Sequence, residues 1–180
     1  MKKVLMLCLA LVLLGCKSPE ARTPVSVKSG SFIDASVERN KRLIEHEHQI
    51  IKDLIANTPG ADFAISDNGF WYQYDVKVEE DSITPQFGDI VNFNYDVSSL
   101  NGQTIYSSEE LKTRDYAMDK EELFSGLREG LKLMKAGETV TFIFPSQKAY
   151  GYYGDSNRIG TSVPLKCTVT INTITQKETN

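Results

Sequence analysis

The sequence has few of the residues from which most catalytic and cross-linked sites are built. Only three cysteines and two histidines occur among 180 residues. A Gly-rich phosphate loop, a Gly-x-Ser-x-Gly elbow and a His-Glu-x-x-His zinc pattern are all absent from the sequence. His46 and His48 are two positions apart and would point to different sides of a helix, which favours solvated surface side chains over a metal site. The sequence therefore gives no support to metal catalysis or phosphoryl transfer, and no cofactor or metal is expected.

An excess of basic residues is also missing. The 20 lysines and arginines are outnumbered by 24 aspartates and glutamates, so the net charge is −4. A mildly acidic chain is a poor ligand for phosphate backbones, and no nucleic-acid partner is expected. The carboxylates occur in runs such as residues 79–81, which are ordinarily solvated, so hydrolysis by paired carboxylates has no distinctive support either.

A long apolar run is absent, but a short one lies near the N-terminus. Lys2 and Lys3 precede an apolar stretch from Val4 to Leu14, which is shorter than the roughly 20 residues that span a bilayer as a helix. It ends in Leu-Leu-Gly-Cys at residues 13–16, which resembles the lipobox of bacterial exported lipoproteins. We therefore expect a signal peptide over residues 1–15 and lipidation of Cys16, which would anchor the chain to a membrane of the bacterial cell envelope, facing the periplasm. A plain secretory signal with a chance cysteine is the alternative.

The cysteines leave no pair for an intramolecular disulfide. Cys8 would be removed with the signal peptide, Cys16 would carry lipid, and only Cys167 would remain. Cys167 lies in an apolar alternation, so a buried thiol is expected rather than a catalytic one.

Two segments precede the main domain. Residues 16–36 are polar, contain Pro19 and Pro24 and show no apolar period, which predicts the lipidated cysteine followed by a flexible tether. Residues 37–57 carry apolar residues such as Ile44, Ile51 and Ile55 at helical spacing between charged ones, which predicts an amphipathic helix. This helix could pack on the following domain or pair with a partner helix, and packing on the domain is favoured.

From residue 62 to residue 176 the apolar period changes to two. Hairpin signals occur at Asn68-Gly69 and Asn101-Gly102. A single helix is predicted where Leu123, Leu127, Leu131 and Met134 recur at spacings of three to four. Strands are predicted within residues 63–65, 72–78, 91–97, 104–107, 139–144 and 165–171. The pattern predicts an α+β domain in which one helix covers one face of an antiparallel sheet.

Three separated motifs in this domain resemble the FKBP-type peptidyl-prolyl cis-trans isomerases. They are Tyr95 on its strand, a helix from Gly126 to Leu133 followed by Met134-x-x-Gly137, and the run "AYG" at residues 149–151. The likeness covers about residues 69–174, in family order. It implies a curved antiparallel sheet wrapped around one short helix, here preceded by an amphipathic helix. Together with the lipobox, the chain is similar to the gliding-motility-associated isomerase lipoproteins of Bacteroidetes.

The resemblance also implies an activity that needs none of the missing residues. Such enzymes rotate the peptide bond before proline without covalent chemistry, by desolvating and twisting the amide. Proline-containing exported polypeptides are then the expected substrates, and a folding helper is the expected role. The alternative is a catalytically weak binding module in an envelope or gliding-motility assembly, with envelope machinery proteins as partners.

Carried over by position, the resemblance places ten residues at a pocket between helix and sheet. Leu127 would form its floor, while the Tyr150 hydroxyl and the Phe124 backbone N–H would hold peptide carbonyls. Tyr152 and Tyr153 are expected to be exposed on the flap that follows. The full expectation is Tyr95, Tyr106, Phe124, Leu127 and Tyr150 as catalytic residues, with Ile105, Tyr116, Leu123, Ile159 and Cys167 as substrate-binding residues.

This chain departs from the family pattern at three pocket positions. Tyr106 stands where the family has an aspartate, Leu127 where it has a tryptophan and Cys167 where it has a phenylalanine. A wider and less acidic pocket is therefore expected. This affects the fit of macrolide inhibitors more than isomerisation itself, because catalysis by desolvation tolerates such changes.

Overall fold

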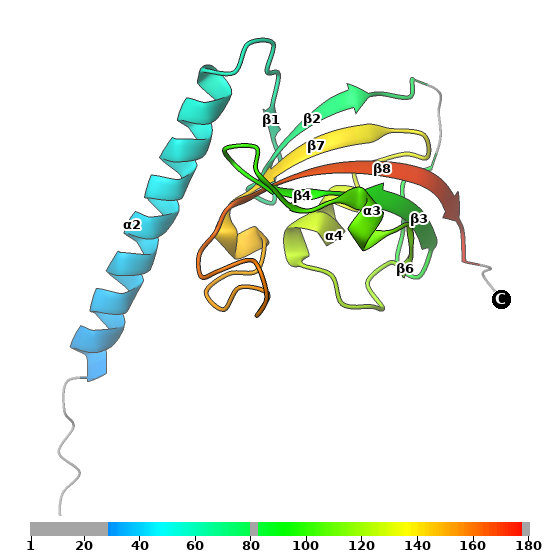
Figure 1. The fold of residues 1–180 in the computed structure, drawn as a ribbon. Helices are drawn as coiled ribbons and strands as arrows, with labels where there is room; N and C mark the ends of the chain where they lie inside the picture. Colours follow the sequence, from blue (N-terminus) through cyan, green and yellow to red (C-terminus); the bar gives the residue numbers. More distant parts are fainter. Residues whose placement is uncertain (1–28, 80–82, 178–180) are drawn as a thin grey trace, which may run out of the picture. The chain divides into compact units, whose positions relative to one another are not determined.

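The computed structural model describes residues 29–79 and 83–177 (Figure 1). The chain divides into two compact units, residues 1–38 and residues 39–180. The predicted signal peptide, the lipidation site at Cys16 and the tether up to residue 28 lie outside the described residues. Within the described ranges, none of the helices combines the length and the apolar character needed to cross a bilayer.

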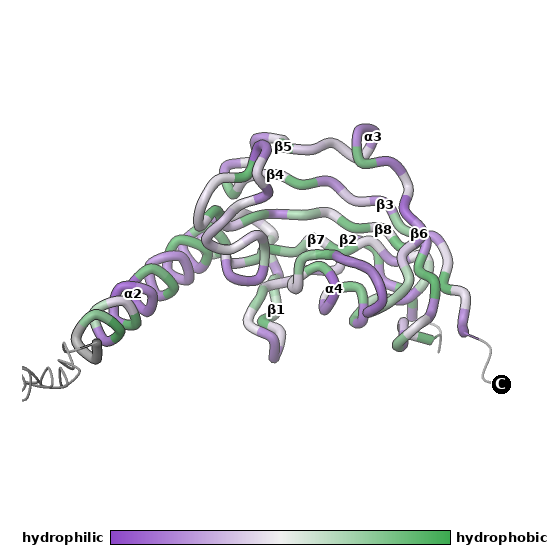
Figure 2. The backbone as a smooth tube through the Cα atoms, turned by 90° about the horizontal axis from the view of Figure 1, so that it is seen from below, coloured by the Kyte–Doolittle hydropathy of each residue, from purple (hydrophilic) through white to green (hydrophobic). Residues whose placement is uncertain are grey.

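Helix α2 spans Ser29–Ala56 and is longer than the sequence predicted. Residues 29–36, expected to belong to the tether, are helical. Ile33 and Val37 extend the apolar spacing in the N-terminal direction, and the first turn of a helix tolerates serine and glycine because its N–H groups have no intrahelical partners. Hydrophobic and hydrophilic residues alternate along α2 in Figure 2. At its C-terminal end, Thr58 Oγ1 donates to the Leu54 carbonyl at 2.7 Å, which satisfies one of the last carbonyls.

Eight strands within the described residues form one antiparallel sheet. The order is β1-β2-β7-β8-β3-β6, and β4 pairs with both β5 and β8. The longest strand, β8, forms hydrogen bonds with β7, β3 and β4 and so holds the sheet together. The strands are β1 (Ala64–Ile65), β2 (Trp71–Val76), β3 (Ile90–Tyr95), β4 (Val97–Ser99), β5 (Thr104–Tyr106), β6 (Arg114–Ala117), β7 (Thr139–Phe144) and β8 (Leu165–Thr175).

Helix α4 covers one face of this sheet, as Figure 1 shows. It spans Ser125–Leu131, so the helical spacing predicted from Leu123 to Met134 begins before the helix and ends after it. Gly126 and Gly130 allow the close approach, because a Cβ atom would lie 2.5 Å from the Phe144 ring at the first position and 2.9 Å from the Phe142 ring at the second. The α+β prediction is thereby confirmed, with a short helix packed inside a curved sheet.

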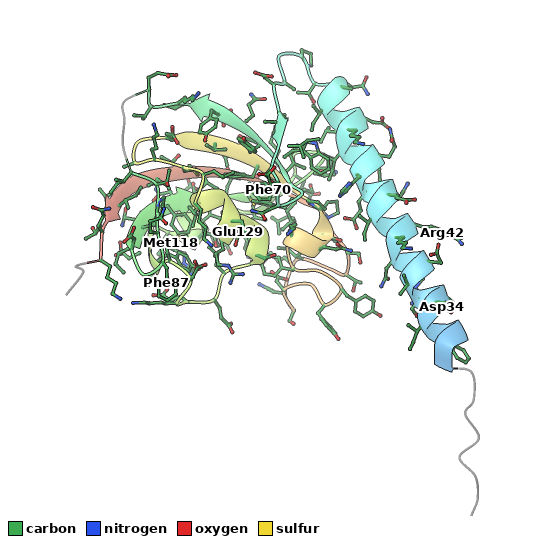
Figure 3. The ribbon with its side chains drawn as sticks, turned by 180° about the vertical axis from the view of Figure 1, so that it is seen from behind. Asp34, Arg42, Phe70, Phe87, Met118 and Glu129 are labelled. Atoms are coloured by element: carbon green, nitrogen blue, oxygen red, sulfur yellow. The ribbon has the colours of Figure 1, made fainter. Side chains whose placement is uncertain are left out.

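The main core fills the space between α4 and the sheet. Phe70, labelled in Figure 3, packs edge-on against Phe142 and Phe144, with ring centroids 5.9 and 5.3 Å apart. Each of these three rings has no exposed surface. Two short elements lie beside this core: α3 (Ser108–Leu111) and the 3₁₀ helix η1 (Ser146–Lys148).

A smaller apolar cluster lies on the opposite face of β2 and β7. Ile51 of α2, Trp71 and Ile143 are buried together there. Strand alternation explains the split, because Phe142 and Phe144 point to the main core while Ile143 points the other way. Residues 39–56 of α2 therefore pack on the domain that follows them, which is the favoured one of the two arrangements expected for this helix. His48, predicted to be solvated, is half-buried with its ring 5.0 Å from that of Trp71, because it lies near the packed side of the helix.

Candidate functional site

A cavity of about 560 Å³ opens where the chain enters α4. Its wall combines strands β3 and β6, the segment before α4, α4 itself and the loop after η1. The lining residues are Tyr95, Arg114, Glu121, Glu122, Leu123, Phe124, Arg128, Ala149 and Tyr150.

Aromatic rings form one part of this wall. The Phe124 ring lies edge-on to Phe144 at 5.4 Å and is tilted against Tyr150 at 5.2 Å between centroids. The Tyr95 ring lies 5.4 Å from Phe93 and is almost fully buried. Edge-on and tilted ring contacts fix the orientation of each ring against a core that is itself close-packed. The aromatic part of the wall is therefore preformed.

Tyr150 presents a hydroxyl group to the cavity. Burial raises the pKa of Tyr150 to about 12, with further contributions from nearby Tyr95 and Asp155, so the hydroxyl stays protonated at neutral pH. Among the described residues this hydroxyl has no hydrogen-bond partner. It is therefore a donor that remains available to a bound carbonyl.

A second donor faces the same region. Phe124 precedes α4 with extended backbone angles, and its N–H makes no backbone hydrogen bond within residues 29–79 and 83–177. The first N–H groups of a helix have no intrahelical acceptor, so this donor is also available. Aromatic rings and two unengaged hydrogen-bond donors together suit a bound peptide segment.

A polar network forms the rim beside the cavity. The Tyr106 hydroxyl donates to the Asp155 carboxylate, and Asn157 Nδ2 lies 3.0 Å from the same hydroxyl oxygen. Asp155 Oδ1 also accepts from the backbone N–H groups of Asn157 and Ile159 at 2.9 and 2.8 Å. Burial and the bond to Asp155 raise the pKa of Tyr106. For Asp155, burial acts to raise the pKa, but the hydrogen bonds from Tyr106 and the backbone outweigh it and the pKa is lowered.

Arg158 ties this rim to β5 and α3. Its guanidinium donates to both carboxylate oxygens of Glu110, at 2.8 and 2.6 Å, and to the Ile105 carbonyl at 2.8 Å. The same group lies 4.8 Å above the Tyr106 ring. We call residues 152–160 the flap. Tyr152 and Tyr153, at its start, are 73% and 87% exposed, which confirms their expected exposure.

Four of the ten predicted site residues line the cavity. They are Tyr95, Leu123, Phe124 and Tyr150. Tyr106 and Ile105 belong to the rim and do not line it. The remaining four lie in the main core and do not line the cavity: Tyr116, Leu127 and Cys167 have no exposed surface and Ile159 has 3%. Alternation along a strand identifies the side chains that face inward. It does not tell which of these side chains are covered by neighbouring residues.

Several wall residues were not foreseen. Arg114 lies on β6, a strand that the sequence pattern did not reveal, although it shares a face with Tyr116 two residues later. Glu121, Glu122 and Arg128 add charge to the entrance, and Arg128 Nε lies 3.5 Å from the Asp119 carboxylate. Side chains two residues apart on a strand share a face, so a strand assigned around Tyr116 would have placed Arg114 on the same face.

Groups suited to metal binding or nucleophilic attack are missing from the described part of the chain. No cluster of three or more histidine, cysteine, aspartate or glutamate side chains is arranged there to hold a metal ion. Burial raises the pKa of the Cys167 thiol, which disfavours the reactive thiolate.

Comparison with known proteins supports a specific family. The family model described as FKBP-type peptidyl-prolyl cis-trans isomerase matches residues 81–172. A probable FKBP-type peptidyl-prolyl cis-trans isomerase FkpA of Neisseria meningitidis serogroup B is 28% identical over 93 residues, which cover 52% of this chain and 34% of that protein. The match thus spans about a third of the length of this curated relative.

Two solved structures share the fold. A peptidyl-prolyl cis-trans isomerase of Pseudomonas syringae pv. tomato has a TM-score of 0.60 at 18% identity, covering 76% of this chain and 96% of that one. FkpA from Escherichia coli has a TM-score of 0.61 at 21% identity, covering 97% of this chain and 82% of that one. Since the family model matches about half of the sequence and the fold agrees, this chain belongs to the FKBP-type peptidyl-prolyl cis-trans isomerase family.

Proposed function

We propose that this chain catalyses cis/trans isomerisation of peptide bonds that precede proline. The observation that carries the proposal is the cavity, in which the rings of Tyr95, Phe124 and Tyr150 surround a space with two unengaged hydrogen-bond donors. Neither an acid, a base nor a metal is needed for this reaction.

The physical reason lies in the amide itself. Rotation about the bond before proline has a barrier of about 18–20 kcal/mol and takes tens to hundreds of seconds unaided. The twisted amide loses resonance and is less charge-separated than the planar form. Contact with aromatic rings in place of water therefore stabilises the twisted amide relative to the planar one, while donors such as the Tyr150 hydroxyl and the Phe124 N–H hold the flanking carbonyls.

The direct test is an exchange measurement on a short proline peptide with the full chain in detergent. We expect acceleration by the wild-type chain and a loss of about tenfold in kcat/KM for Tyr150→Phe, since one hydrogen bond corresponds to about 1.4 kcal/mol. Tyr153→Phe is the matched control, because that ring is 87% exposed, and its rate should equal the wild-type rate. A wild-type chain that binds the peptide without accelerating exchange would instead support a binding module.

We further propose that the chain acts from a membrane, as a lipid-anchored folding helper for proline-containing exported proteins. The support is the order of Lys2 and Lys3, the apolar run and Gly15-Cys16. Lipid on Cys16 would retain the domain near polypeptides as they emerge into the periplasm.

The anchor has its own test. Mass spectrometry of the N-terminal peptide should find acyl chains on Cys16, and Cys16→Ser should move the protein from the membrane to the soluble fraction. Cleavage at another site without lipid would support the plain secretory signal. Slower maturation of exported proline-rich proteins in a strain lacking the isomerase activity would support the folding role.

A further inference from the structure

Glu47 of α2 is a carboxylate in an unexpectedly buried position. It is 8% exposed, and it lies in the same compact unit as the isomerase domain, residues 39–180. Its Oε1 accepts a hydrogen bond from Ser146 Oγ at 2.7 Å, and its Oε2 accepts one from the Ser146 backbone N–H at 2.8 Å. Ser146 is 4% exposed, so both bonds are shielded from water. A buried carboxylate is costly unless it is hydrogen-bonded, and bonds to a charged acceptor are the stronger kind.

Ser146 is connected directly to the cavity wall. It begins η1, and its carbonyl accepts from the N–H of Ala149 at 3.1 Å and from the N–H of Gly151 at 2.8 Å. These two residues stand on either side of Tyr150. Ser146 therefore holds the backbone on both sides of Tyr150.

The other end of the contact is equally fixed. Ile51 follows Glu47 by one helical turn, on the same face of α2, and has no exposed surface where it packs against Trp71 and Ile143. His48 adds its ring contact with Trp71. Helix α2 thus holds the Glu47 carboxylate in place by packing on the outer face of the sheet.

We propose that Glu47 is a positioning residue for the isomerase site, acting through Ser146 on Tyr150. The inference rests on the proposed isomerase function. It makes residues 39–56 of α2 a part of the catalytic unit, although they lie outside the segment that matches the family model. Glu47 and Ser146 are 99 positions apart in the sequence, so no local sequence pattern predicts their contact.

Activity measurements on the full chain in detergent test the proposal. Glu47→Ala should lower kcat/KM for a proline peptide about tenfold, because small displacements of positioned groups are costly to catalysis. Glu47→Gln keeps one acceptor oxygen, so its kcat/KM should lie between those of the wild-type chain and Glu47→Ala. Glu45→Ala is the matched control, since it removes the same charge from an exposed position on the same helix and should leave kcat/KM unchanged. Ser146→Ala removes only the hydroxyl bond, and its effect should largely vanish in the Glu47→Ala background.

Hydrogen exchange separates positioning from a general loss of stability. In Glu47→Ala, the amides of Ala149 and Gly151 should exchange at least about tenfold faster, while those of Phe142 and Val169 in the core strands keep their wild-type rates. Wild-type kcat/KM and wild-type exchange at residues 149 and 151 would overturn the proposal. Equal acceleration in the core strands would overturn it too.

Two further outcomes remain decisive. If Glu47→Ala does not fold, Glu47→Gln and Ser146→Ala provide the same comparison. If the wild-type chain has no isomerase activity, the proposed function fails and the positioning role fails with it, whereas the exchange rates at residues 149 and 151 still decide whether Glu47 holds the loop.

Discussion

The aromatic wall of the cavity and its polar rim are built on different physical principles. The wall residues Tyr95 and Phe124 pack on rings that have no exposed surface. The rim is held by hydrogen bonds and ion pairs, among them those of Tyr106 to Asp155 and of Arg158 to Glu110.

This difference predicts how each part behaves. Burial of large rings contributes much to stability and leaves little freedom, because a close-packed core does not deform gradually. The side chains of Arg158 and Glu110 are 47% and 45% exposed, and ion pairs at such exposure contribute little. We therefore expect a rigid wall that sets the chemistry, and a rim that opens locally to admit different polypeptides.

The largest expected effect is at Phe142, whose ring stacks on Phe144, the ring that contacts Phe124 of the wall. Phe142→Ala should lower the free energy of unfolding by about 3–5 kcal/mol, because it removes a fully buried ring that stacks on Phe144. Denaturant unfolding measures this loss. Tyr153→Ala, at an exposed flap position, should stay within about 0.5 kcal/mol of wild type. Similar losses at both positions would show that the core ring beneath the wall and the exposed flap contribute equally to stability.

Gly126→Ala tests the contact between α4 and the loop that carries Tyr150. The added Cβ would lie 2.5 Å from the Phe144 ring and 2.7 Å from the Lys148 carbonyl oxygen, which is backbone and cannot turn aside. We expect a loss of about 1–3 kcal/mol in unfolding free energy and a lower kcat/KM. Gly130→Ala should cost less, because its nearest neighbour is the Phe142 ring at 2.9 Å. The opposite ranking would show that the Lys148 backbone in η1 shifts more easily than the Phe142 ring.

Tyr106→Phe tests the rim alone. It removes the hydroxyl bonded to Asp155 and Asn157 but keeps the ring below Arg158. We expect a loss of about 1 kcal/mol and faster hydrogen exchange within residues 155–159, with wild-type exchange in β7 and β8. Uniformly faster exchange throughout the sheet would contradict a separable rim.

The last comparison concerns the pH dependence of stability. Burial raises the pKa of Tyr150 to about 12, whereas an unfolded chain releases a tyrosine proton near pH 10. Between these values the unfolded state binds fewer protons than the folded state, so the free energy of unfolding should fall as the pH rises. The fall should be less steep in Tyr150→Phe, as measured by urea unfolding at a series of pH values. An equally steep fall in both proteins would assign the effect to other tyrosines.

Much of the fold follows from patterns that are local in the sequence. The change from a helical period to a period of two separates α2 from the sheet, and alternation places Phe93, Phe142 and Val169 on the buried face. The closely spaced glycines of α4 mark the place where a helix approaches aromatic rings. Strand β6 was missed because Tyr116 is its one large apolar residue, so Arg114–Ala117 shows no repeating apolar position.

The site was predicted less completely. Tyr150 and Phe124 were identified because their motifs are local, and both line the cavity. Leu127 and Cys167 belong to the main core and have no exposed surface. Arg114 and Arg128 enter the wall because β6 and α4 meet at the cavity, which no spacing within either segment indicates.

The sequence by itself determined which side chains point inward and where the helices and most strands lie, because these depend on residues a few positions apart. The tertiary structure alone decided which inward residues remain open to a ligand. It also brought Glu47 to Ser146, which is 99 positions away. Coverage and buried pairing depend on segments that are distant in the chain, and so they arise only when packing brings those segments together.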